Sequence, residues 1–255
     1  MSDGSFSPKT SYGTAAWIIQ DELTGSELTG LMIIPGQPED LDAYRCELGG
    51  LYGIVVIVDA LCAYHSVTSG SITRACDGEQ ALRHATNVYD WISPARPHFD
   101  LIAAIWARNA RTPLTWESKH VKGHQDEGRH AALDRCAHLN VRMDAQAKAH
   151  LQATIGDASR ILQQKIAGEP WALWIGNRKV VRKLWEEVIH HVQGPPCKQY
   201  WDDKHRFDPV DSDEVDWQAT AKAMKTVPHS RRIYVTKHSA GICGVGKWMK
   251  RWKQR

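Results

Sequence analysis

The sequence lacks the patterns that mark several common classes of protein. Its six cysteines form no CxxC pair, which argues against a zinc ribbon within the chain and fits reduced thiols in an intracellular protein. It has no run of about 18 apolar residues, so we expect no transmembrane helix. The first residues, "MSDGSFSPKT", contain no basic segment followed by an apolar one, so we expect no signal peptide. These absences predict an intracellular protein, in the cytoplasm or the nucleus, with no membrane partner.

Acidic residues are also absent from the C-terminal end. From Lys225 to Arg255 there are nine Lys or Arg residues and no Asp or Glu, although the whole chain has a net charge of only +3. Such a block favours contact with a polyanion such as nucleic acid. A solvated basic surface is the alternative interpretation.

The rest of the composition is typical of folded domains. The chain has 255 residues, of which 42% are hydrophobic and 24% charged, and this length suffices for one large domain or two small ones. Residue patterns predict strands over 14–20, 28–34, 71–77 and 114–121, and helices over 41–62, 79–92, 99–108 and 132–151. Because strands and helices alternate after a strand-rich start, we expect a mixed α/β sheet with helices packed on it.

The second half of the chain has its own character. It carries seven of the eleven tryptophans, so we expect two domains, over residues 1–152 and 153–255, the second with a small core of its own. Its patterns predict a hairpin over 169–181 that turns at Gly176-Asn177, and a helix over 181–192 followed by a "GPPC" loop. They further predict a helix over 217–225, a strand over 232–236 and a helix over 246–253.

Four acidic residues occupy positions where a carboxylate is unusual. Asp3 starts the first hairpin, Glu47 borders the apolar stripe of the first helix, and Asp77 ends a short strand. Asp144 lies in the long helix on the same face as Asn140, four residues earlier. A carboxylate beside a buried face needs compensation, which Mg²⁺ would supply. Singly, each acid is more simply a turn or helix-edge residue, but the set of four, at ends of elements that could converge, favours a metal site.

The segments around these acids resemble the motifs of the ribonuclease H family, in order. They read "DGS" with "GTAAWII", then "YRCELGGL", "CDGEQAL" and "KHVKGHQDE…LNVRMDAQAK". The last is the most specific, because it joins a Gly-His loop to an Asn-x-x-x-Asp helix. The spelling is most similar to the domains that follow reverse transcriptase in retroelement polyproteins, and "RRIYVTKHSAGICGVGKWMKRW" resembles the tail found downstream in such reading frames.

The resemblance implies a fold and an activity. The fold would be a ribonuclease H-like mixed five-stranded sheet flanked by helices, with a smaller C-terminal α+β extension. The activity would be cleavage of the RNA strand of RNA–DNA hybrids with two Mg²⁺ ions, for which Mn²⁺ can substitute. A reverse transcriptase polymerase domain, upstream in a polyprotein, is an implied partner.

The resemblance also implies roles for particular residues. Asp3, Glu47, Asp77 and Asp144 would be the catalytic metal ligands, and His124 would assist proton transfer or product release. Gln80 or Asn140 would sense the ribose 2′-hydroxyl. The full set expected to contact nucleic acid is Gln80, Asn140, Lys122, Lys247, Lys250 and Arg251.

Two other functions stay open at this point. The chain could be a catalytically weak module that binds hybrid or duplex within a reverse transcriptase polyprotein. It could also be a DNA-directed nuclease of the same architecture, such as a transposase or resolvase. Those enzymes usually lack the Gly-His loop and the Asn-x-x-x-Asp helix, so residues 120–144 argue against the latter.

Overall fold

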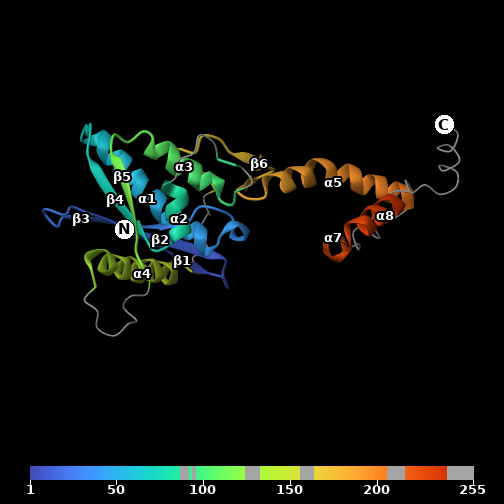
Figure 1. Cartoon of the computed structure of the whole chain (residues 1–255), viewed down its shortest axis with the longest axis horizontal. Coiled ribbons are helices and arrows are strands. Elements are labelled where there is room, and N and C mark those ends of the chain that lie inside the picture. The colour runs from blue at the N-terminus through green and yellow to red at the C-terminus, as the bar shows by residue number, and fades with distance from the viewer. Residues whose placement is uncertain (87–91, 94–95, 124–132, 156–163, 206–215, 240–255) are drawn as a thin grey trace. The chain divides into compact units, whose positions relative to one another are not determined.

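The computed structural model describes residues 1–86, 92–93, 96–123, 133–155, 164–205 and 216–239 (Figure 1). The chain divides into two compact units, Met1–His191 and Val192–Arg255.

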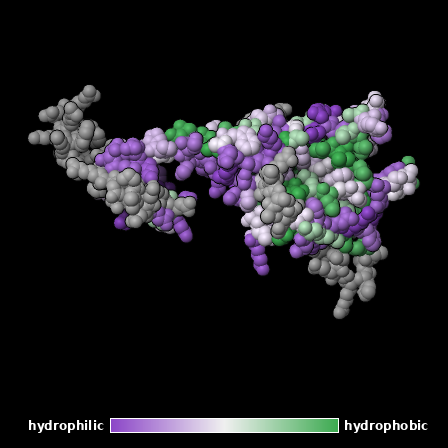
Figure 2. Space-filling model, turned by 180° about the vertical axis from the view of Figure 1, so that it is seen from behind, coloured by the Kyte–Doolittle hydropathy of each residue, from purple (hydrophilic) through white to green (hydrophobic). Residues whose placement is uncertain are grey.

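An antiparallel sheet opens the first unit. Its strands lie in the order β1 (Ser2–Ser7), β2 (Tyr12–Gln20) and β3 (Glu27–Ile33). The strand predictions over 14–20 and 28–34 are thus confirmed to within two residues. β3 is the edge strand of the sheet, and it exposes several apolar side chains. The surface of this unit carries apolar patches surrounded by polar residues (Figure 2).

The central strand β2 is buried on both faces, which explains its continuous apolar sequence. Trp17 packs with Ile54 and Val58 of helix α1 (Ala43–Tyr64). The next residue, Ile18, points the opposite way and joins a cluster with Met143 of helix α4 (Arg135–Thr154). Figure 1 shows these two helices on opposite sides of the sheet. Alternation along a strand therefore supplies two cores at once.

Helix α1 is the central helix of this unit. Its N-terminus is capped by Asp42, whose side chain accepts a hydrogen bond from the Arg45 N–H. By length and composition this helix could cross a membrane, although 61% of its most apolar stretch of 18 residues is buried inside the fold. From the sequence we expected no apolar stretch of this length, so the finding differs from that expectation. A single, mostly buried helix of this kind is nevertheless only weak evidence for a membrane span.

A parallel strand pair follows α1. It consists of β4 (Ser71–Cys76) and β5 (Thr115–His120), connected through α2 (Glu79–Thr86) and α3 (Phe99–Asn109). Parallel strands need such a helical crossover. The mixed α/β architecture is as expected, but the described strands form sheets of three, two and two strands. These described strands therefore do not form the expected single five-stranded sheet. β1 lies beside β4, but no hydrogen-bonded ladder joins the two strands.

The first unit extends well beyond residue 152. A short hairpin of β6 (Leu173–Ile175) and β7 (Arg178–Val180) turns at Gly176-Asn177, as expected, and leads into α5 (Leu184–His205). Val180 and Leu184 pack on Phe99 of α3. The hairpin thus packs on the first unit, and the compact units divide at 191/192, whereas the sequence pattern predicts a domain boundary at 152/153.

Two further predictions for the second half are wrong. Helix α5 continues through Pro195 and Pro196, where "GPPC" was expected to form a loop, although each proline removes a backbone donor from the helix. Residues 232–236 belong to helix α8 (His229–Ser239) instead of a strand. Their β-branched side chains favour strands only weakly, and context overrides such preferences. The expected helix over 217–225 is confirmed as α7 (Trp217–Thr226).

The second unit shows no separate core in its described residues, 192–205 and 216–239. The buried hydrophobic clusters that the structure describes draw all their members from the first unit. The tryptophan content of this half therefore did not predict its packing. The expected helix over 246–253 lies outside the described residues.

A buried ion-pair network fixes the hairpin to the core. The carboxylate of Asp100 on α3 accepts two hydrogen bonds from the guanidinium of Arg45, both at 2.9 Å, and one from Lys179 Nζ of β7 at 3.0 Å. Burial alone would raise the pKa of Asp100, but the two cations together lower it to about 2. The three side chains are almost fully buried, and Lys179 also forms an ion pair with Glu169.

Removing Asp100 should destabilise the first unit strongly. Asp100→Ala leaves two buried cations without their shared carboxylate, which typically costs about 3–5 kcal/mol. Urea unfolding monitored by tryptophan fluorescence would measure the loss. Glu27→Ala, which removes the exposed pair with Arg142, is the matched control and should cost at most about 1 kcal/mol. Equal losses for the two variants would contradict the account.

Candidate functional site

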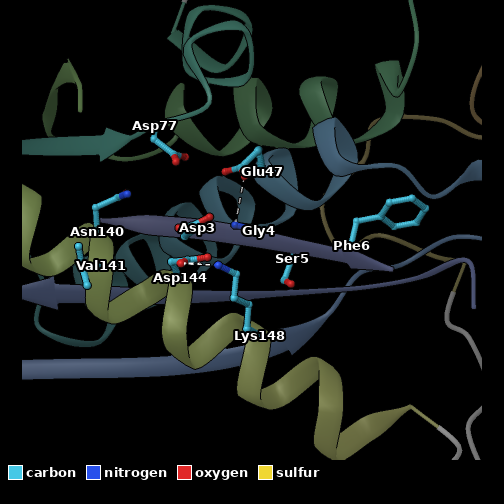
Figure 3. A pocket seen from close by; sticks show the side chains of 10 residues that line it. All are labelled: Asp3, Gly4, Ser5, Phe6, Glu47, Asp77, Asn140, Val141, Asp144 and Lys148. Atoms are coloured by element: carbon cyan, nitrogen blue, oxygen red, sulfur yellow. Dashed lines mark hydrogen bonds and ion pairs between the residues drawn. The ribbon is translucent and has the colours of Figure 1, made fainter. Parts of the chain in front are cut away.

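A pocket of about 250 Å³ lies where β1, α1, β4 and α4 meet (Figure 3). It contains all four acids that the sequence singled out. Its lining residues are Asp3, Gly4, Ser5, Phe6, Glu47, Asp77, Asn140, Val141, Asp144 and Lys148. Segments that lie far apart in the sequence are thus brought together around one cluster of carboxylates.

Strand pairing explains the orientation of Asp3. It lies directly opposite Ala16 of β2, and opposite residues of an antiparallel pair project from the same face. Ala16 clusters with Met143 and Ala147 of α4, so Asp3 also projects toward that helix. Only 4% of Asp3 is exposed. The pairing therefore places a nearly buried carboxylate beside the helix that carries Asp144.

Hydrogen bonds from β1 and β4 hold Glu47 in place. Its Oε1 accepts from the Gly4 N–H and its Oε2 from the Cys76 thiol, each at 3.3 Å. The Gly78 N–H in turn donates to Cys76 Sγ at 3.3 Å. A Cβ on Gly4 would lie 2.5 Å from the backbone of Cys46, so only glycine lets β1 approach the start of α1 this closely. Glu47 is consequently held from both sides.

Asp77 lies immediately after β4, where the chain meets the end of β5. The Nε2 of His120 lies 3.0 Å from the carbonyl oxygen of Asp77. A Cβ on Gly123 would lie 2.6 Å from Asp77 Oδ2, so the glycine of the Gly-His motif permits close contact with this carboxylate. His124, the predicted accessory histidine, lies outside the described residues.

The clustered acids repel one another. Burial, and then the charges of Asp77 and Asp144, raise the pKa of Asp3 to about 7. Burial, and then Asp3 and Asp77, likewise raise the pKa of Glu47 well above its ordinary value. The pocket thus concentrates more negative charge than the protein alone balances, and it would favour any bound cation.

The donor atoms of the pocket fit a hard divalent cation. Carboxylate and amide oxygens are the ligands that Mg²⁺ prefers. Asn140 is 3% exposed, and its Oδ1 has no hydrogen-bond partner within the described part of the protein, which is costly unless a ligand satisfies it. Glu47, Asp77 and Cys76 also offer ligand atoms within 4.8 Å of one another. The carboxylates and Asn140 could hold Mg²⁺ or Mn²⁺, whereas the Cys76 thiol is a soft donor that these ions do not favour.

The remaining predicted contact residues lie in different places. Gln80 is exposed in the first turn of α2, and Lys122 is exposed beside Gly123; neither lines the pocket. Three more predicted contacts lie outside the described residues: Lys247, Lys250 and Arg251.

Lys148 and Cys76 contact the acids of the site but were not among the residues predicted for it. Lys148 ion-pairs with Asp144 at 2.7 Å and could have been found from its helical spacing of four. Cys76 precedes Asp77 directly, but nothing in the sequence signalled that its thiol contacts Glu47.

Comparison with known proteins adds no family assignment. No protein-family model matches the sequence, and no curated protein matches it.

Asp3 should make the stability of the metal-free protein depend on pH. Since its pKa is about 7 when folded and ordinarily 3.8, the folded protein binds more protons than the unfolded chain between those values. The free energy of unfolding therefore falls as pH rises from about 4 to 7, and the penalty is complete above pH 7. Asp3→Asn should remove this penalty. At pH 8 the variant should be more stable than the metal-free wild type by about 1 kcal/mol or more, whereas at pH 4 it should be only slightly more stable.

Urea unfolding in EDTA at the two pH values measures this difference. Saturating Mg²⁺ is the internal control, because it should favour the wild type, which keeps the extra carboxylate. A variant equally stabilised at pH 4 and pH 8 would contradict the electrostatic cause.

Proposed function

We propose that the chain is a divalent-metal-dependent endonuclease of the ribonuclease H type, which hydrolyses the RNA strand of RNA–DNA hybrids. The observation that carries this proposal is the convergence of Asp3, Glu47, Asp77 and Asp144 on one pocket. They come from four separate motifs that resemble that family in order, and no local rule of folding requires four such carboxylates to meet.

The order of elements supports the same proposal. From β1 to α4 the chain forms three antiparallel strands, a long helix, a parallel strand pair with a helical crossover, and the helix α4. We infer that β1 and β4, which lie beside each other, join the two sheets into the ribonuclease H-like order β3-β2-β1-β4-β5.

The residues of the pocket would have different roles, either holding metal ions or positioning the metal ligands. Two Mg²⁺ ions, when bound, would activate the attacking water and stabilise the departing 3′-oxygen. Asp3, Glu47, Asp77 and Asp144 would hold them, with Glu47 kept in position by Gly4 and Cys76. Both Asp3 and Glu47 would lose their protons to solvent as cations enter, since their raised pKa values reflect burial and mutual repulsion.

Recognition of the substrate would use groups around the pocket. The Oδ1 of Asn140, which has no hydrogen-bond partner among the residues that the structure describes, could accept a hydrogen bond from a ribose 2′-hydroxyl, which DNA lacks. The exposed Lys122 would contact a phosphate, and the basic residues Lys247, Lys250 and Arg251 would add contacts to the hybrid. We propose a retroelement origin for the chain, with a reverse transcriptase polymerase domain as its partner.

Cleavage of matched substrates tests this function. The protein should cut a labelled RNA–DNA hybrid in Mg²⁺ or Mn²⁺ but not in EDTA, and should cut duplex DNA and duplex RNA far more slowly. Hybrid binding without cleavage by folded protein would overturn the proposed activity and favour the alternative, a binding module of a reverse transcriptase polyprotein.

Two substitutions test the assignment of the acids. Asp77→Asn and Asp144→Asn should each lower the rate of hybrid cleavage by more than the roughly 10–100-fold typical of residues that only support a metal ligand. Hybrid binding, measured by fluorescence anisotropy, should persist. Glu27→Gln, an acid outside the pocket on β3, is the control and should cleave normally. A normal rate for either pocket variant would refute the site.

A further inference from the structure

Lys148 is the one cationic side chain among the described residues that line the acidic pocket. It lies one turn after Asp144 on α4, and its Nζ donates to Asp144 Oδ2 at 2.7 Å. Figure 3 shows the side chain turned from the helix toward the acids. The Lys148 ammonium is therefore close enough to neutralise the charge of the Asp144 carboxylate.

This contact differs from an ordinary pair on a helix surface. An i, i+4 pair normally stabilises a solvated helix face by a few tenths of a kcal/mol. Arg142 on the same helix pairs with Glu27 of β3, outside the pocket and at a similar degree of exposure. Lys148 differs because it lines the pocket in which Asp144 lies together with Asp3, Glu47 and Asp77.

We propose that Lys148 is a built-in counter-cation of the acidic pocket, which balances Asp144 in the metal-free protein and competes with divalent ions for that carboxylate. The inference rests on the proposed function, because it takes the four acids to be a metal site. Lys148 would be a positioning residue that sets the metal concentration at which the site fills.

The expected effect follows from Coulomb repulsion. A divalent ion and an ammonium several Å apart in a solvated site repel by an amount that corresponds to roughly a tenfold change in binding constant. Entry of the ion would also require the ammonium to give up its contact with Asp144. Neutralising Lys148 should therefore tighten metal binding, whereas losing a residue that supported the site would weaken it.

Direct Mn²⁺ binding tests the proposal without nucleic acid. The free Mn²⁺ signal in electron paramagnetic resonance would be titrated against the full chain. Lys148→Met and Lys148→Gln should each bind Mn²⁺ roughly tenfold more tightly than the wild type. Lys148→Arg, which keeps the charge, should stay near the wild type. Arg142→Met, which removes one charge from the same helix outside the pocket, should do so too.

The other outcomes separate this proposal from the proposed function. If the wild type binds Mn²⁺ and the neutral variants bind it equally or more weakly, the counter-cation is refuted and the metal site stands. A raised KM for hybrid with unchanged Mn²⁺ affinity would make Lys148 a phosphate contact, which also refutes it. If no folded variant binds Mn²⁺ at all, the metal site falls and the counter-cation falls with it.

Discussion

Repulsion among four clustered carboxylates, one buried and three half-buried, is the physical constraint on which the proposed site depends. Asp3, Glu47, Asp77 and Asp144 line one pocket, and burial together with their mutual charge raises the pKa of two of them. Such a cluster destabilises the folded protein unless bound cations or neighbouring positive charges balance it. The hydrogen bonds to Glu47 and the ion pair of Lys148 stabilise the arrangement only in part. The proposal of a metal-dependent nuclease accounts for this cost, because bound cations would balance the carboxylates.

Much of the first unit could be predicted from the sequence, because its signals are local. The strand β2 has a continuous apolar run, and the hairpin of β6 and β7 has a Gly-Asn turn. The four acids lie at the ends of elements or beside apolar stripes, where a carboxylate without compensation is costly. The resemblance in motif order then indicated that they meet. Local pattern and tertiary structure agree best in this part of the chain.

The remaining features depend on contacts between distant residues, which a pattern in one sequence does not contain. Asp100 and Lys179 form a buried pair across 79 positions, and this contact helps extend the first unit beyond residue 152. Helix α8 formed where β-branched residues favoured a strand, since such preferences are weak beside context. Within the site, the contact of the Cys76 thiol with Glu47 arises only when β4 packs beside α1.

Anomalous diffraction from crystals soaked in Mn²⁺ tests the central claim most directly, because it locates the ion without relying on activity. The account predicts an anomalous peak in the pocket of the first unit, with carboxylate oxygens of Asp77 and Asp144 among the ligands. Well-ordered crystals at saturating Mn²⁺ with no peak between the four acids would contradict it, as would carboxylates that point away from a common centre.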